Sequence, residues 1–299
     1  MAMENHDAHD LGLPHDLGVM GRKEVGRRQT LWLLLSGASV ALVAACGGDD
    51  STGSSSDSGT GTTTATPTPS PTPTPTPAST SGSCAVTPAE TNGPYPADGS
   101  NSANGSVVNA LIQSGIVRAD IRPSFGSYSG TADGFTTLLT ITLVNTNGSC
   151  APLAGYAVYV WHCTRSGQYS LYDLPQQNYL RGVGMTDSNG QVTFTTIFPG
   201  CYSGRYPHIH FEVYPSLDKA TTYANRVLVS QFAMPADACN TVYATSAYAT
   251  SKTNFASITT ANDNVFGDNS TAQITAMTPV MTGDITNGYT GSVTVGLAV

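Results

Sequence analysis

The feature that most constrains this chain is a stretch from residue 47 to residue 83 that is dominated by Gly, Ser, Thr and Pro, with alternating Thr-Pro, once Ser-Pro, between Thr66 and Pro77. A segment without large apolar side chains cannot bury a core, and it favours extended polyproline II conformations. We therefore expect a disordered, semi-stiff linker at residues 47–83. Residues 84–299 remain as the part that can fold, and they are numerous enough for a domain with a real core.

Residues 1–46 have the features of a targeting segment. Arg27 and Arg28 precede an apolar run at 31–45, which ends at Cys46. This order is typical of a charged region, a hydrophobic region and a processing site. The paired arginines resemble a twin-arginine export signal, and the Leu-Val-Ala-Ala-Cys sequence ending at Cys46 resembles a bacterial lipobox, whose cysteine is lipidated. An uncleaved membrane anchor is disfavoured, because the run is shorter than the ~20 residues that a spanning helix needs.

These features predict an exported bacterial lipoprotein whose signal peptide is removed up to Cys46. We expect a lipid anchor at Cys46 to attach the protein to a membrane, on the periplasmic side or at the cell surface. Four of the 12 basic and five of the 20 acidic residues precede Cys46, which leaves eight basic and 15 acidic residues after it. With this acidic excess and no basic run, we expect no nucleic acid partner.

Beyond Cys84 the apolar residues form short runs rich in Val, Ile, Thr and Tyr, separated by clusters of Gly, Asn, Asp and Pro. Such runs predict β-strands. The expected strands are 138–144, 156–162, 191–197, 208–214, 227–232 and 291–297. Only residues 247–261 have a weak helical character, and the Asp-Ser-Asn-Gly sequence at 187–190 is typical of a hairpin turn. The pattern predicts an all-β fold with an antiparallel β-sandwich core and long loops.

Only three histidines follow Cys46, namely His162, His208 and His210. In a strand, residues i and i+2 point to the same face, so His208 and His210 are expected to project their imidazoles to one side. Such a pair is a candidate metal clamp. His162 ends another predicted strand, and it is either a functional residue or a buried histidine of the core.

Two tyrosines lie close to these histidines in the sequence. Tyr202 precedes His208 by six residues in a loop rich in Gly and Pro, and Tyr169 follows the strand predicted at 156–162. With these positions, the sequence resembles the intradiol ring-cleavage dioxygenases, the non-haem ferric enzymes related to protocatechuate 3,4-dioxygenase and catechol 1,2-dioxygenase. The motifs that carry the resemblance are, in order, Thr91-Asn92-Gly93-Pro94-Tyr95-Pro96, Trp161-His162-Cys163, Gly167-Gln168-Tyr169-Ser170, Leu180-Arg181-Gly182, Thr186-Asp187, Pro199-Gly200, Gly204-Arg205 and His208-Ile209-His210.

The resemblance extends over essentially all of residues 84–299, and residues 263–266 are similar to the tail of exported, single-domain relatives. It implies a dioxygenase that cleaves the aromatic ring of a catechol-type substrate, such as catechol or protocatechuate, between the two hydroxyl-bearing carbons. Both atoms of O2 would enter the product, a cis,cis-muconate-type diacid.

The resemblance also implies that Tyr169, Tyr202, His208 and His210 bind one Fe(III) per domain. Two phenolates and two imidazoles are a donor set that stabilises ferric iron. Tyr202 would be the ligand that leaves when substrate arrives and then takes a proton from the catechol. The other implied catalytic residues are Arg205, which would stabilise negative charge on the ring, and Gln231.

The implied substrate-binding residues are Tyr95 and Trp161, as pocket walls, and Arg181, which either reaches a substrate carboxylate or pins a loop. The sequence departs from the family at Cys201, where a bulky residue is expected, and in lacking the large helical N-terminal region of the catechol enzymes. The substrate and the oligomeric state stay open.

Five cysteines follow Cys46. In an oxidising compartment they are expected to form one or two disulfides, whose pairing the sequence does not fix. A bridge between Cys163 and Cys201 would fasten both tyrosine loops. Two other classes of function remain open: a surface-tethered β-sandwich binding module without catalysis, and a zinc or copper enzyme that uses the two clamped histidines.

Overall fold

The computed structural model describes residues 84–299. The predicted export signal, the lipidation site at Cys46 and the predicted linker at 47–83 lie outside the described residues. Within residues 84–299, no helix has the length and apolar character needed to cross a membrane.

The described chain consists mainly of strands with a few short helices, so the all-β expectation is confirmed. The strands are β1 (Asp98–Ala103), β2 (Ser106–Asn109), β3 (Thr136–Asn145), β4 (Ala151–Pro152), β5 (Ala157–Trp161), β6 (Arg181–Met185), β7 (Gln191–Ile197), β8 (His208–Tyr214), β9 (Leu228–Ala233), β10 (Val280–Asp284) and β11 (Gly288–Leu297). The helices are α2 (Ala236–Tyr243), α3 (Ala249–Phe255) and α4 (Thr271–Met277), with 3-10 turns η2 (Leu217–Lys219), η3 (Tyr223–Asn225), η4 (Ser246–Tyr248), η5 (Thr260–Asn262) and η6 (Phe266–Asp268).

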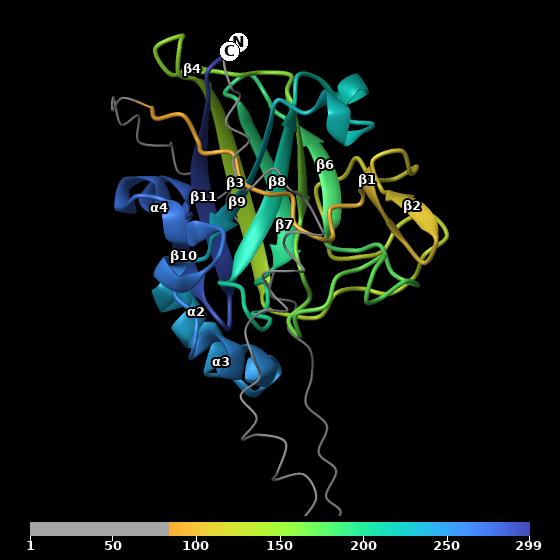
Figure 1. Ribbon diagram of the computed structural model, residues 1–299, viewed down its shortest axis with the longest axis vertical. Coiled ribbons are helices and arrows are strands. Elements are labelled where there is room, and N and C mark those ends of the chain that lie inside the picture. Colours follow the sequence, from red (N-terminus) through yellow and green to blue (C-terminus); the bar gives the residue numbers. More distant parts are fainter. Residues whose placement is uncertain (1–83) are drawn as a thin grey trace, which may run out of the picture. The chain divides into compact units, whose positions relative to one another are not determined.

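The strands form two main sheets and one hairpin (Figure 1). One sheet has the order β6-β5-β8-β9, and all its pairs are antiparallel. The other has the order β10-β11-β3-β4, with β7 also paired to β3. The expectation of purely antiparallel pairing is wrong at β11 and β3, which run parallel. Alternation of apolar residues determines which face is buried but not strand direction, and the long chain between β3 and β11 permits either direction.

The six predicted strands all occur, with bounds that differ by a few residues at most. The short strands β1, β2, β4, β6 and β10 were not expected. The weak helical character at 247–261 corresponds to α3, whereas α2 and α4 were missed because each is too short for its periodicity to stand out. Figure 1 shows the three helices gathered beside β10 and β11.

Both faces of the β6-β5-β8-β9 sheet are buried. On one face, Val160 and Phe211 join a core cluster with Leu139 and Val295 of the other sheet. Alternate residues point the opposite way, where Trp161 packs in a second cluster with loop and hairpin residues. His208 and His210 lie on this second face, because Ile209 between them belongs to the first cluster. The predicted clamp is therefore covered by loops, not by the other sheet.

One disulfide joins Cys84 to Cys150, while Cys163, Cys201 and Cys239 are free and buried. The Cys163–Cys201 bridge, one of the pairings that the sequence left open, is absent from the described residues. The Sγ of Cys163 lies 3.5 Å from the carbonyl oxygen of Gly200, and the Sγ of Cys201 lies 3.5 Å from that of Arg205. Each thiol thus has a backbone carbonyl as its neighbour.

Candidate metal centre

Three side chains surround the Nε2 atom of His208 and form a cluster of four with it. The Nε2 of His210 lies 3.0 Å from it, the Oη of Tyr202 lies 3.2 Å from it, and the Oη of Tyr169 lies 3.3 Å from it. The two histidines come from β8, and the two tyrosines come from separate loops. The structure therefore brings together the four residues that the sequence predicted as metal ligands.

Contacts on the sides of the rings that face away from the cluster fix the orientation of His208 and His210. The Nδ1 of His208 lies 2.5 Å from the carbonyl oxygen of Tyr206, so this nitrogen carries the proton and donates. The Nε2 lone pair then faces the cluster. The ring of His210 lies flat against Trp161, with 4.8 Å between ring centroids and an angle of 6°. Its other side is close to Gly93, where a Cβ atom would come within 3.1 Å of the His210 Cε1.

The two tyrosine loops approach each other through a glycine. Gly167 has φ +86°, and a Cβ atom at this position would lie 2.8 Å from the Cβ of Tyr202. The backbone N–H of Tyr169 donates to the Oδ2 of Asp173 at 2.7 Å. The Tyr169 side chain is buried, whereas Tyr202 is half-buried. Gly167 thus permits both phenols to reach the same histidine.

Burial sets the protonation states of the cluster. It raises the pKa of Tyr169, with the neighbouring Tyr202 acting in the same direction, and it also raises the pKa of Tyr202. It lowers the pKa of His208 to about 3, assisted by the positive charge of Arg205. The pKa of His210 is lowered as well, by burial and then by His208. The imidazoles are therefore neutral donors at ordinary pH, and the phenols need a nearby cation to ionise.

The donor set fits a trivalent metal ion. Two atoms bound to one ion at about 2 Å each must lie within about 4 Å of one another, and the three distances to the His208 Nε2 meet this condition. Two neutral imidazoles and two phenols that ionise on binding suit Fe(III), because hard anionic oxygen donors favour the ferric state. Elsewhere in residues 84–299, no three His, Cys, Asp or Glu side chains gather as a metal site.

A buried polar network stands beside the cluster. The Nε of Arg205 donates to the Oδ2 of Asp263 at 2.9 Å, and its Nη2 donates to the Oε1 of Gln231 at 2.6 Å. Gln231, which pairs with His210 across the sheet, donates from its Nε2 to the carbonyl oxygen of Thr91 at 2.8 Å. The structure thus joins two predicted catalytic residues, Arg205 and Gln231, in one chain of hydrogen bonds.

Sequence reasoning gave Asp263 no role. Its side chain is fully buried, and its Oδ2 also accepts the backbone N–H of Tyr206 at 2.6 Å. It therefore holds both the guanidinium of Arg205 and the backbone N–H of Tyr206, the residue whose carbonyl oxygen contacts the Nδ1 of His208. The available signal was indirect: a buried arginine is often paired with a carboxylate, and residues 263–266 already belonged to the resemblance.

The side chain of Arg181 is occupied by the protein itself. Its five N–H groups are directed at the Oγ and carbonyl oxygen of Ser170, the carbonyl oxygens of Tyr95 and Pro96, and the Oη of Tyr159. A guanidinium has only five such donors. Of the two interpretations of Arg181, the structure favours the one in which it pins loops.

The remaining predicted residues lie around the cluster. Trp161 is buried and stacks on His210, and Tyr95 is half-buried with its ring centroid 4.8 Å from that of Tyr169. His162 is different, because its Nδ1 lies 2.8 Å from the Cys163 carbonyl oxygen and its Nε2 lies 2.6 Å from the Thr196 Oγ1. Burial lowers its pKa to about 4. These contacts favour the interpretation of His162 as a buried core histidine.

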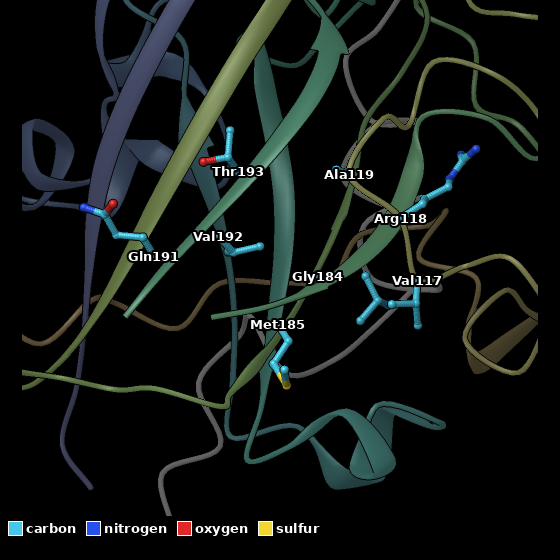
Figure 2. Close-up of a pocket in the computed structure, with 9 residues that line it drawn as sticks. Val117, Arg118, Ala119, Gly184, Met185, Gln191, Val192 and Thr193 are labelled. Atoms are coloured by element: carbon cyan, nitrogen blue, oxygen red, sulfur yellow. The ribbon is translucent and has the colours of Figure 1, made fainter. Parts of the chain in front are cut away.

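A surface groove elsewhere is separate from this cluster. Figure 2 shows it between β6 and β7, with Arg118, Met185 and Thr193 among its lining residues. None of the nine residues that line it is one of the predicted site residues. The groove is therefore not part of the candidate metal centre.

Comparisons with known proteins agree on one family. Residues 124–272 match the family model described as "Dioxygenase". No curated protein matches the sequence. Among solved structures, the intradiol ring-cleavage dioxygenase from Tetranychus urticae is 21% identical with a TM-score of 0.51, covering 71% of this chain and 94% of that one. The likeness to this structure shows a shared fold.

Two further solved structures are more distant. The dioxygenase domain of a carbohydrate-binding fusion protein from Streptomyces sp. SirexAA-E is 19% identical, with a TM-score of 0.44, and the match covers 72% of this chain and 99% of that one. Catechol 1,2-dioxygenase from Pseudomonas arvilla C-1 is 18% identical, with a TM-score of 0.39, and the match covers 60% of this chain and 56% of that one.

Proposed function

The chain belongs to the intradiol ring-cleavage dioxygenase family, and from this premise we propose that residues 84–299 form a non-haem ferric dioxygenase. The enzyme cleaves the ring of a catechol-type substrate between the two hydroxyl-bearing carbons and inserts both atoms of O2. The product is a cis,cis-muconate-type diacid. The observation that carries the proposal is that the phenols of Tyr169 and Tyr202 and the imidazole of His210 all lie within 3.3 Å of the Nε2 of His208.

The two tyrosine ligands have different roles in the proposed reaction. When bound, Fe(III) supplies Lewis-acid chemistry that draws electron density from the catechol oxygens. Tyr202 is the half-buried ligand on a loop, so it is the one with room to move when a catechol arrives. Its phenolate oxygen then accepts a proton from a catechol hydroxyl. Tyr169 is buried and its backbone is anchored to Asp173, so it stays in place.

Arg205 and Gln231 support charge on the ring. Asp263 fixes the guanidinium of Arg205 in a buried position near both phenols, where positive charge stabilises an electron-rich ring during reaction. Gln231 holds the same guanidinium from the β9 side. Trp161 and Tyr95 flank the ligands and exclude water from this side of the cluster.

We also propose the cellular setting and the arrangement of the layers. The lipid anchor at Cys46 and the Ser/Thr/Pro-rich linker at 47–83 hold the enzyme at a bacterial membrane, on the periplasmic side or at the cell surface. The two main sheets face one another as a β-sandwich, since their side chains share one core cluster. O2 and small aromatic diols then reach the domain outside the cytoplasm.

The test is the visible absorption spectrum of the purified chain after iron loading, together with its iron content. Tyrosinate bound to ferric iron gives a charge-transfer band, so we expect a purple-red protein whose band shifts when catechol is added without O2. Tyr169→Phe and Tyr202→Phe are expected to weaken the band. Tyr179→Phe is the matched control, because Tyr179 lies in the same loop region as Tyr169 but has no contact with the cluster.

A chain that stays colourless after iron loading would contradict the proposal. The surface-tethered binding module would then become the better interpretation. A band that survives in both ligand variants would contradict the tyrosine assignment while leaving iron binding intact.

A further inference from the structure

The segment that leads into the proposed ligand Tyr202 is held by side chains of the helical region. We call this segment, residues 198–201, the stem of Tyr202; it follows β7 directly. The hydroxyls of Tyr243 on α2 and Tyr248 on η4 donate to two successive carbonyl oxygens of the stem, at 2.9 Å and 2.8 Å. Both tyrosines are buried. The helices therefore bind the backbone that carries a metal ligand.

The last residue of the stem, Cys201, has both of its backbone polar groups bound to α3. Its N–H donates to the Oγ of Ser251 at 2.9 Å, and its carbonyl oxygen accepts the Nδ2 of Asn254 at 2.7 Å. The side chain of Ser251 is fully buried. Movement of Cys201 would leave buried polar groups without partners, which is costly. α3 thus fixes the point from which Tyr202 extends.

Ser251 also connects the stem to the loop of the other ligand tyrosine. Its hydroxyl donates to the carbonyl oxygen of Arg165, in the loop that carries Tyr169, at 2.9 Å. The two backbones are in contact at Gly200, where an added Cβ would lie 2.5 Å from the Thr164 carbonyl oxygen. A single buried hydroxyl therefore bridges the two ligand loops at the place where they cross.

The chain is fixed again shortly after Tyr202. Arg205 is buried and bound to the carboxylate of Asp263. Between these two points, Ser203 is exposed, and Gly204 has φ +88° with no atom within 4 Å of an added Cβ. Tyr202 therefore lies on a short, partly exposed turn between two fixed residues. This arrangement leaves its side chain room to rotate while its stem stays in place.

We propose that Ser251 and Asn254 are positioning residues for Tyr202. The inference rests on the proposed function, in which Tyr202 gives way to an arriving catechol and accepts its proton. With the stem held by α3, the phenol leaves by rotation of its side chain and returns to the same position after each turnover. Without these contacts the spacing of the two ligand loops is no longer set, and the phenol is misplaced for proton transfer.

The test compares the visible charge-transfer band of the iron-loaded full chain in two states: at rest, and with catechol bound in the absence of O2. Both tyrosines contribute to the band at rest, whereas Tyr169 alone remains bound in the catechol complex. For Ser251→Ala we expect a weaker band at rest and an unchanged band in the catechol complex, at equal iron content. We also expect kcat to fall about tenfold or more.

A second measurement needs no metal. Hydrogen exchange of the Cys201 N–H is followed in the iron-free chain, where loss of its acceptor in Ser251→Ala is expected to speed exchange at least about tenfold. Ser257→Ala is the matched control, because the Ser257 hydroxyl is exposed and donates to the Asn254 carbonyl oxygen. We expect this control to keep the wild-type exchange rate, both bands and kcat.

Asn254→Ala is the second test variant. Asn254 is only partly buried, so its loss disturbs the fold less than the loss of the Ser251 hydroxyl. We expect the same selective weakening of the band at rest, with a smaller fall in kcat. This variant decides the question where Ser251→Ala does not fold.

The outcomes separate the inference from the proposed function. A wild-type band at rest and a wild-type kcat in both test variants overturn the inference and leave the proposed function standing. A proportional loss of both bands together with iron shows that α3 supports the whole centre, and it also overturns the specific link to Tyr202. A wild-type chain that stays colourless after iron loading and does not turn over catechol overturns the proposed function and the inference with it.

Discussion

At the scale of single residues, the candidate centre depends on partners that have no direct contact with a substrate. Asp263 is the main example, because it binds both the guanidinium of Arg205 and the N–H of Tyr206. Its pKa is lowered even though burial acts in the opposite direction, because Arg205 and three backbone N–H groups stabilise the charged form. The carboxylate is therefore a fixed negative charge that organises the residues around it.

Asp263→Asn is expected to destabilise the fold by about 3–5 kcal/mol, because it leaves the buried Arg205 charge without its counter-ion. Urea unfolding at neutral pH measures the loss. The control is Asp133→Asn, which breaks an ion pair between Arg165 and a carboxylate whose side chain is 74% exposed. That variant is expected to lose less than about 1 kcal/mol. Equal losses of unfolding free energy in the two variants would show that the buried ion pair stabilises the fold no more than the exposed one.

The residue scale also marks the limits of sequence reasoning. The ligand histidines were predictable, because alternation in a strand places i and i+2 together. The tyrosines were found through the family resemblance, and the structure brings all four side chains together. The partner of Arg205 was not predictable, since Asp263 lies 58 positions away and no local periodicity links the two.

At the scale of elements, the segment that leads into β1 shapes the site as much as β8 does. Residues 84–97 cross the sheet, with the Glu90 N–H donating to the Val229 carbonyl, and they bring Gly93 against the ring of His210. Gly93 has φ +68°, a conformation that glycine adopts without strain. Gly93, in the segment before β1, thus packs directly against the ring of His210 in β8.

Gly93→Ala is expected to lower iron affinity as well as stability. The backbone conformation costs about 1 kcal/mol for alanine, and the new Cβ would press on the His210 Cε1 at 3.1 Å. Gly105→Ala is the matched control, with φ +80° but no atom within 4 Å of the added Cβ. We expect it to lose stability alone. Iron titration with parallel unfolding curves separates the two effects, and equal iron binding in both variants would contradict the role of Gly93.

Element prediction succeeded where the sequence pattern is strong. β7 and β8 have the predicted bounds, because each has a clear run of β-branched or aromatic residues. β6 was missed because its sequence Arg-Gly-Val-Gly-Met contains two glycines that disfavour strands. Those glycines are required by packing: a Cβ at Gly182 would lie 2.4 Å from Ile121, and one at Gly184 would lie 2.5 Å from Val192.

At the scale of the whole molecule, the Cys84–Cys150 disulfide closes a long loop. The two cysteines are separated by 66 positions, and they join the start of the described chain to the turn between β3 and β4. A crosslink of this span restricts the unfolded chain strongly. The sequence predicted that disulfides form but not which cysteines pair, because pairing depends on the fold that brings them together.

Replacing both cysteines, Cys84→Ala with Cys150→Ala, is expected to destabilise the protein by about 2–5 kcal/mol. The absorption band of the iron-loaded chain should stay unchanged, because neither cysteine contacts the cluster. Guanidinium unfolding with and without a reductant measures the effect. The wild-type chain should lose stability on reduction, and the double variant should not respond. A reductant effect in the double variant would point to a different crosslink.

The position of this disulfide also decides how the protein bears a pulling force. Tension applied through the chain before residue 84 reaches Cys84 first, and the covalent bond passes it to Cys150 at the β3–β4 turn. The segment that carries Gly93 begins only beyond that junction, so it is relieved of much of the load. Under the proposed anchor, the domain could be dragged by flow or by a moving surface while the geometry around His208 and His210 is left undisturbed.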